Sequence, residues 1–201
     1  YEYLTIHDEK ALINNLRHQL ELINDYIFSD SEWEQFFTNC IANKNEGIVE
    51  KTRKIQTDHV QILHRDNGST KNIYLIDKKH IHNNQLQVIN QYETAEGKRE
   101  TRYDVTVLVN GLPLVHIELK KRGVSLQEAF NQINRYSRES FWAGSGLFEY
   151  VQLFIISNGT LTKYYSNTTR ETHIKEKGKD TSTKKKKSSN SYEFTSWWAD
   201  A

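Results

Sequence analysis

The stretch from residue 102 to 123, RYDVTVLVNGLPLVHIELKKRG, holds two apolar runs on either side of an Asn-Gly pair. Asn-Gly suits the turn of a tight β-hairpin, because both turn positions need a positive φ. The stretch therefore predicts two antiparallel strands. Each strand nevertheless carries charge within it, with Asp104 in the first and Glu118 and Lys120 in the second. Any fold of this chain has to accommodate these charged groups.

Alternation along the two strands puts their polar groups on one side. Residues two apart in a strand share a face of the sheet. His116, Glu118 and Lys120 therefore form one polar row, and Asp104 and Thr106 form a second row in the first strand. Whether the two rows meet depends on the turn between the strands.

The turn length sets which residues face each other across the hairpin. A two-residue turn makes the numbers of paired residues add to 221, which separates the acids, whereas a three- or five-residue turn gives 222 and pairs Asp104 with Glu118. Pro113, the only proline, has no N–H to donate and disfavours continuous pairing beside the turn. We therefore predict the even sum and a turn longer than two residues.

Two carboxylates placed opposite each other repel unless a cation neutralises them. Mg²⁺ prefers hard oxygen ligands, so two carboxylates, a backbone carbonyl and phosphate oxygens of a substrate would complete its shell. Lys120, two residues after Glu118, could then hold or activate a water that attacks phosphorus. The pattern favours phosphodiester hydrolysis. The competing interpretation is a solvated edge hairpin with a polar row, since the acid-x-Lys spacing also occurs at 77–79 and 96–98.

The rest of the chain predicts an α/β fold with a mixed central β-sheet flanked by helices. Apolar residues recur with a helical period over 8–25, 29–42 and 124–141. We expect Asp30 or Ser31 to cap the second of these helices, and Ser125 to cap the third. Runs of strand-forming residues lie at 58–64, 71–77, 85–93, 149–159 and 160–167.

Composition bears on where the protein works and on what precedes it. No run approaches the roughly 18 apolar residues of a membrane span, and the first residues lack a signal-peptide pattern. The single cysteine, Cys40, cannot form an internal disulfide. We expect a soluble, cytoplasmic protein. Because the chain contains no methionine, we also expect it to be a fragment whose translation start lies upstream.

Positive charge is concentrated near the C-terminal end. Seven lysines stand against Glu176 and Asp180 within 175–187, although the whole chain has a net charge of +1. Such a run is usually solvated, although it could contact DNA phosphates nonspecifically. We expect a globular domain over 1–170, a basic flexible linker over 171–191, and a docking segment or the start of a following domain over 192–201.

Three other residues are candidates for a metal site or a nucleophile. His80 and His82 would share a face of an extended strand and could bind a transition metal, but two histidines without a third ligand are more often surface residues. Cys40 lies behind Phe36 and Phe37 in the helical pattern and is expected to be an inert core residue rather than a nucleophile.

Four stretches carry a resemblance to a known family. They read NIYLIDKK, RYDVTVLVNGLPLVHIELKKRG, EAFNQINRYSRESF and LFIISNGT. In order and spacing they resemble the N-terminal endonuclease domain of the R subunit of type I restriction enzymes, a branch of the PD-(D/E)xK nucleases, over most of 30–170. The resemblance implies a Mg²⁺-dependent endonuclease acting on double-stranded DNA.

The resemblance also assigns roles to residues. It implies Asp104 and Glu118 as Mg²⁺ ligands together with the Leu119 carbonyl, and Lys120 as the catalytic lysine. The family's Gln-x-x-x-Tyr motif is matched by Gln132 and Tyr136, which share a helical face.

Three arginines near this motif, Arg122, Arg135 and Arg138, are expected to contact DNA phosphates. Two departures from the family are visible. Tyr103 stands where proline often precedes the aspartate. Such nucleases also often take a further acid from a helix upstream of where this chain begins, so we expect this fragment to lack that element.

The resemblance implies partners as well. The family's motor domain follows in the same polypeptide, with methyltransferase and specificity subunits in the complex. No Gly-rich phosphate loop ending in Gly-Lys-Ser/Thr occurs, so ATP is not expected to bind this chain. Two alternatives stay open: a noncatalytic DNA-binding or docking module with the same fold, and a standalone nuclease.

Overall fold

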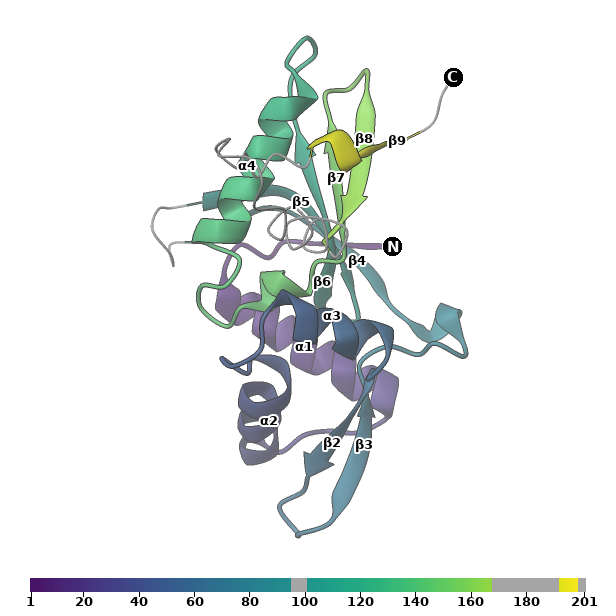
Figure 1. Ribbon diagram of the computed structural model, residues 1–201. Coiled ribbons are helices and arrows are strands. Elements are labelled where there is room, and N and C mark those ends of the chain that lie inside the picture. Colours follow the sequence, from purple (N-terminus) through teal and green to yellow (C-terminus); the bar gives the residue numbers. More distant parts are fainter. Residues whose placement is uncertain (95–100, 168–191, 199–201) are drawn as a thin grey trace, which may run out of the picture.

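The computed structural model describes residues 1–94, 101–167 and 192–198, and its central feature is a seven-stranded sheet (Figure 1). Its strands, in spatial order, are β1 (Glu2–Leu4), β4 (Leu86–Thr94), β5 (Thr101–Val109), β6 (Leu112–Leu119), β7 (Leu153–Ser157), β8 (Thr162–Ser166) and β9 (Ser196–Trp197). The β1–β4 and β6–β7 pairs are parallel and the other pairs are antiparallel. The prediction of a mixed sheet flanked by helices is confirmed.

Two of the predicted strands lie outside this sheet. β2 (Val60–His64) and β3 (Thr70–Tyr74) pair only with each other and form a two-stranded ribbon, which extends below the main sheet in Figure 1. One side of the ribbon is buried through Leu63 and Ile73, whereas Ile62 and Tyr74 are exposed. The ribbon thus follows the usual alternation of a half-buried antiparallel pair.

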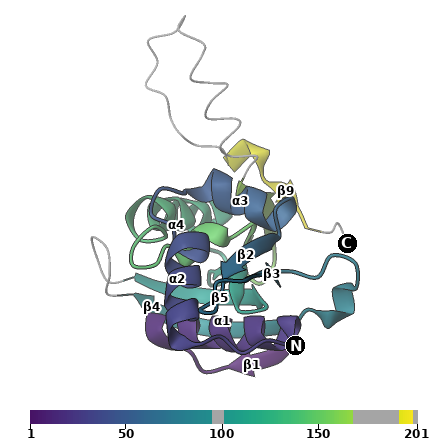
Figure 2. The ribbon, with the colours of Figure 1, turned by 90° about the horizontal axis from the view of Figure 1, so that it is seen from below.

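Four α-helices lie in the described part of the chain: α1 (Glu9–Asn24), α2 (Asp30–Phe36), α3 (Ile48–Gln56) and α4 (Leu126–Glu139). The cap of α2 differs from the prediction, because Ser29 rather than Asp30 or Ser31 accepts the N–H of Glu32 in a capping box. A π-helix (Phe37–Ile41) follows α2 directly. Ser125 caps α4, as predicted. In Figure 2, α1 lies beside β1 at one side of the molecule, and α4 lies at the opposite side of the molecule.

Helix α3 escaped prediction because its inward face is partly charged. Lys51 and Lys54 are buried on this face beside Ile55, so no apolar period marks the helix in the sequence. Each lysine reaches an acid: Lys51 pairs with Glu149, and Lys54 pairs with Glu46.

The hairpin turn is shorter than predicted. Val109 pairs with Leu112, so the turn is the two-residue Asn110-Gly111 pair, and both of its residues have positive φ, 49° and 82°. The prediction of a longer turn is wrong. Packing requires glycine at this turn position, since a Cβ on Gly111 would lie 2.6 Å from the Cα of Leu16 in α1.

The even register is nevertheless present near the charged residues. Next to the turn, Leu108 pairs with Pro113, a sum of 221, but Val107 pairs with Val115 and Val105 with Ile117, a sum of 222. The shift is a β-bulge in which Leu114 is the extra residue. Extended by one residue, this register places Asp104 opposite Glu118.

The C-terminal part is described only in pieces. The predicted linker over 171–191 lies outside the described residues, so its nature stays a prediction. Within 192–198, Tyr192 packs against Phe130 of α4, with ring centroids 5.5 Å apart, and Ser196 and Trp197 pair with β8. Whether this segment begins another domain stays open.

Gly111→Ala should destabilise the fold more than a positive φ alone explains. We expect the free energy of unfolding to fall by about 1–2 kcal/mol from the backbone conformation and by a further amount from the contact with α1. Urea unfolding followed by circular dichroism measures this loss. Gly68→Ala is the matched control, because Gly68 also has a φ of 82° but nothing lies within 4 Å of its added Cβ. Equal losses in the two variants would contradict the close packing of the turn on α1.

Candidate active site

The predicted polar rows meet under α4, near the C-terminal end of β6. Thr106, His116 and Glu118 are at most 1% exposed, whereas Val115 and Ile117, on the other face of the sheet, are only half-buried. The interpretation as a solvated edge hairpin is therefore wrong. Buried polar groups carry a cost unless they are paired, so this row needs partners.

The strict alternation fails at one position. Tyr103 was expected on the face opposite Thr106, but its ring packs edge-on against His116, with centroids 5.5 Å apart. Gln91, which lies opposite Asp104 in the β4–β5 register, has a φ of 52° and interrupts the ladder there. The sequence gives no sign of this irregularity.

Asp104, Glu118 and Lys120 come together as the sequence predicted. An Oδ2 atom of Asp104 accepts the backbone N–H of Leu119 at 2.8 Å. The ammonium of Lys120 donates to Oε1 of Glu118 at 3.1 Å. Asp104 is half-buried, Glu118 is completely buried, and the Lys120 side chain is 20% exposed, so the group opens to solvent on the side of Asp104 and Lys120.

A chain of hydrogen bonds ties Lys120 to α4. Lys120 also donates to the carbonyl oxygen of Gln132, and the amide nitrogen of Gln132 donates to the hydroxyl of Tyr136. That hydroxyl donates in turn to the backbone carbonyl of Arg102 in β5, at 3.0 Å. Gln132 and Tyr136 are thus in the site, and both hold the lysine rather than facing solvent.

The carboxylates act on Tyr136 through space. Burial is the main cause that raises the pKa of the Tyr136 hydroxyl, and the hydrogen bond from Gln132 opposes it. The charges of Glu118 and Asp104 raise this pKa further. The Tyr136 hydroxyl therefore lies in the electric field of both acids.

A basic groove leads away from the lysine. It has a volume of about 600 Å³, and its lining includes Lys120, Lys121, Gln132 and Arg135, with Glu128 as its acid. Cations outnumber the acid, which suits a chain of phosphates. Clustered Lys and Arg side chains are the usual phosphate contacts.

The three arginines that were predicted to contact DNA phosphates lie in different places. Arg135 is exposed at the groove, with its guanidinium 5.7 Å from the centre of the Tyr136 ring. Arg122 is also exposed and lies beside the turn at Gly159. The side chain of Arg138 lies outside the described part of the structure. Arg135 thus lines the groove and Arg122 does not, and the role of the arginines as phosphate contacts stays a prediction.

The donor set fits a hard divalent cation. Asp104 and Glu118 contribute two carboxylates against one ammonium, so these three side chains carry an excess negative charge that a cation would balance. Two carboxylates with a neighbouring backbone carbonyl are also the oxygen ligands that Mg²⁺ accepts. Within the described residues no group of three or more His, Cys, Asp or Glu side chains is arranged to hold a metal, so a softer multi-ligand site is not seen there.

Comparison with known proteins places the chain. The family described as type I restriction enzyme R protein N terminus matches residues 1–173. The chain belongs to this family. It is 49% identical over 99% of its length to the type I restriction enzyme EcoprrI endonuclease subunit of Escherichia coli, of which it covers 58%. It is 41% identical over 83% of its length to the SsaAORF53P endonuclease subunit of Staphylococcus saprophyticus, of which it covers 18%.

The family membership confirms the resemblance, and the coverage limits what it transfers. The chain spans less than two thirds of these relatives, so much of each relative has no counterpart in it. No helix in the described ranges is both long and apolar enough to cross a membrane.

The other candidate residues do not form sites. His80 precedes a short 3-10 helix (Ile81–Asn83) and His82 lies within it, so neither stands in a strand, and His80 lies 3.6 Å from Asp77. Cys40 is half-buried, and burial raises the pKa of its thiol, which disfavours the reactive thiolate.

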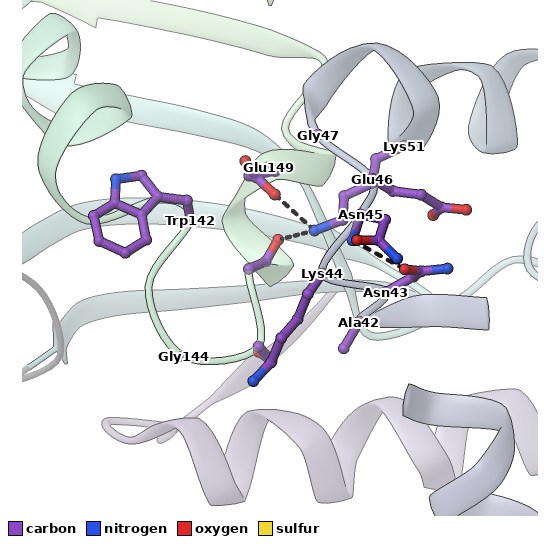
Figure 3. Close-up of a pocket in the computed structure, with 12 residues that line it drawn as sticks. Ala42, Asn43, Lys44, Asn45, Glu46, Gly47, Lys51, Trp142, Gly144 and Glu149 are labelled. Atoms are coloured by element: carbon purple, nitrogen blue, oxygen red, sulfur yellow. Dashed lines mark hydrogen bonds and ion pairs between the residues drawn. The ribbon is translucent and has the colours of Figure 1, made fainter. Parts of the chain in front are cut away.

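A second cleft, missed by the sequence analysis, lies between the start of α3 and the loop before a 3-10 helix (Leu147–Tyr150). It has a volume of about 440 Å³ and is drawn in Figure 3. The Lys51 ammonium in its wall donates to the Gly146 carbonyl at 2.9 Å and to Glu149 at 2.7 Å. This lysine is therefore paired within the chain and holds the loop against α3.

Tyr136→Phe should cost about 1–2 kcal/mol of unfolding free energy, because the Arg102 carbonyl and the Gln132 amide lose their shared partner. Urea unfolding measures the change. Tyr150→Phe is the matched control, since the Tyr150 hydroxyl donates to the Ile41 carbonyl at 3.0 Å, away from the candidate site. We expect comparable losses in both variants. An unchanged Tyr136→Phe beside a destabilised Tyr150→Phe would contradict the hydrogen-bond chain.

Proposed function

We propose that this chain is the endonuclease domain of a type I restriction enzyme R subunit, and that it hydrolyses phosphodiester bonds of double-stranded DNA with Mg²⁺. The observation that carries the proposal is the meeting of Asp104, Glu118 and Lys120 at the end of a basic groove. This arrangement supports the assignment as a PD-(D/E)xK site. The names of the relatives, which are type I restriction enzyme endonuclease subunits, agree with it.

Asp104 and Glu118, with the Leu119 carbonyl, would hold the Mg²⁺. When bound, the ion supplies charge stabilisation at the phosphate and a more acidic water. Lys121 and Arg135 would position the DNA strand by contacting its phosphates along the groove. Lys120 would donate hydrogen bonds to the attacking water or to a phosphate oxygen, and so stabilise the negative charge that develops there.

Gln132 and Tyr136 have a supporting part in this proposal. Their hydrogen bonds fix the Lys120 ammonium relative to both β5 and α4. Fixed donors cost no reorganisation when the reaction occurs, which is why a positioned lysine is more effective than a mobile one. Gln132 is therefore assigned to lysine positioning rather than to contact with a DNA base.

The remaining parts of the enzyme would lie elsewhere. We propose that an ATP-driven motor domain of the same polypeptide supplies translocation, and that methyltransferase and specificity subunits supply site recognition. The complex would act in the cytoplasm. A noncatalytic module with the same fold is the alternative, and metal binding separates the two.

Asp104→Ala should abolish or weaken metal binding by at least about tenfold, because it removes one of two carboxylate ligands. Calorimetric titration of the chain with Mn²⁺ and Mg²⁺ measures this. Glu128→Ala is the control, since it removes an exposed carboxylate from the same groove but outside the proposed ligand set. Metal indifference of the unsubstituted chain would favour the noncatalytic module.

Lys120→Ala in the assembled enzyme should abolish double-strand breaks and leave ATP-driven movement along DNA intact. The reason is that the substitution removes the ammonium at the reacting phosphate and nothing from the motor. Gel analysis of plasmid cleavage and a translocation assay measure the two activities. Lys121→Ala, the neighbouring exposed lysine, should keep cleaving and lose only some DNA affinity. Normal breaks by Lys120→Ala would remove this residue from the chemistry.

A further inference from the structure

Four buried polar atoms lie in a line beside the candidate site without a hydrogen-bond partner. They are Oγ1 of Thr106, both ring nitrogens of His116, and Oε2 of Glu118. Thr106 and His116 are directly paired across β5 and β6, and His116 and Glu118 are two residues apart on one strand face. Buried polar groups are nearly always paired, so a line of four such atoms calls for an account.

One pair of these atoms is already near hydrogen-bonding distance. Nε2 of His116 lies 3.5 Å from Oε2 of Glu118, and a shift of roughly 0.5 Å would give an ordinary hydrogen bond. Directly paired residues on one strand face have Cβ atoms about 4.5–5.5 Å apart, which lets the Thr106 hydroxyl reach the nearer side of the imidazole.

The surroundings of His116 offer little else to bond with. Its ring lies among the rings of Tyr103, Tyr136, Phe141 and Phe154, with centroids 5.5, 6.1, 5.9 and 6.5 Å away. The Tyr103 hydroxyl is committed to Ser140, and the Tyr136 hydroxyl to Gln132 and Arg102. An apolar residue would fill this aromatic pocket without burying unpaired polar atoms. The presence of a histidine is therefore explained if its imidazole bonds to the adjacent Glu118 carboxylate.

We infer that His116 is a positioning residue for Glu118: its Nε2–H holds Oε2 of the carboxylate, while Thr106 donates its hydroxyl hydrogen to Nδ1 and so fixes the tautomer. The inference rests on the proposed function, since Glu118 is taken as a metal ligand. With Oε2 held from the inside, Oε1 is directed toward Lys120 and the place of the cation. Metal-ligating groups are commonly oriented by such outer hydrogen bonds.

The first test is Mn²⁺ affinity measured by calorimetry on the whole chain. His116→Leu should weaken binding by about 10–100-fold, as loss of an outer-shell partner does elsewhere. His116→Gln, which keeps an N–H donor near the position of Nε2, should retain binding within roughly threefold of the unsubstituted chain. Ile156→Val is the matched control, because Ile156 pairs with Glu118 from β7 and is equally buried but apolar. We expect its Mn²⁺ affinity to be unchanged.

The second test reads the tautomer directly. Nitrogen-15 spectra of the imidazole, assigned through the signal lost in His116→Gln, should show the proton on Nε2. Thr106→Val should weaken this preference and lower the Mn²⁺ affinity by less than His116→Leu does. This variant also serves if His116→Leu does not fold.

The outcomes separate this inference from the proposed function. If Asp104→Ala loses Mn²⁺ but His116→Leu binds it normally, the proposed function stands and the role of His116 is refuted. Equal losses in His116→Leu and His116→Gln, or a proton on Nδ1, also refute it. If the unsubstituted chain and Asp104→Ala bind Mn²⁺ alike, the proposed function fails, and with it any role of His116 in holding a metal ligand.

Discussion

The candidate site depends on one extra residue in β6. Without the bulge at Leu114, the pairing next to the two-residue turn, in which the residue numbers add to 221, would continue along the hairpin. Asp104 would then pair with Ile117, and Glu118 would lie on the opposite face of the sheet. The bulge shifts the pairing by one, and a shift of one exchanges the faces. The carbonyl of Leu114 keeps a hydrogen-bond partner although it is outside the β5–β6 ladder, because the backbone N–H of Gln152 donates to it at 2.8 Å. The segment before β7 thus stabilises the bulge.

The turn and the bulge are shaped by different residues. The backbone of α1 lies so close to Gly111 that a side chain at this turn position would clash with it. Pro113 follows directly and has no N–H to donate to the ladder, and the bulge occurs at the next residue, Leu114. Packing against a helix therefore requires glycine in the turn, and the bulge restores the register that brings the acids together.

Much of this could be predicted from the sequence, and the failures are specific. The alternation of His116, Glu118 and Lys120 is a local pattern, and it predicted one polar row of the candidate site. Gln132 and Tyr136 were assigned to the site by the family resemblance. The predicted turn length was wrong because Pro113 was expected to prevent pairing beside a tight turn, whereas Leu108 pairs with Pro113 and the irregularity lies at Leu114.

Burial of the polar row was missed for a different reason. Polar side chains on one strand face usually indicate solvent, but here α4 and the aromatic residues after it cover that face. Helix α3 was missed because its buried lysines are paired with acids that are distant in the sequence or in a loop. In both cases the partners that make a buried polar group tolerable come from elsewhere in the fold.

The hydrogen bonds of Gln132 bear on what this domain can recognise. Its carbonyl oxygen is used by Lys120 and its amide nitrogen donates to Tyr136, so its polar atoms serve the lysine. The cations that line the groove, Lys121 and Arg135, suit phosphates, and phosphate contacts fix the position of a duplex without reading its sequence. A domain built in this way would cut wherever DNA is presented to it. In the proposed enzyme, the choice of site would therefore have to come from the parts that deliver the DNA.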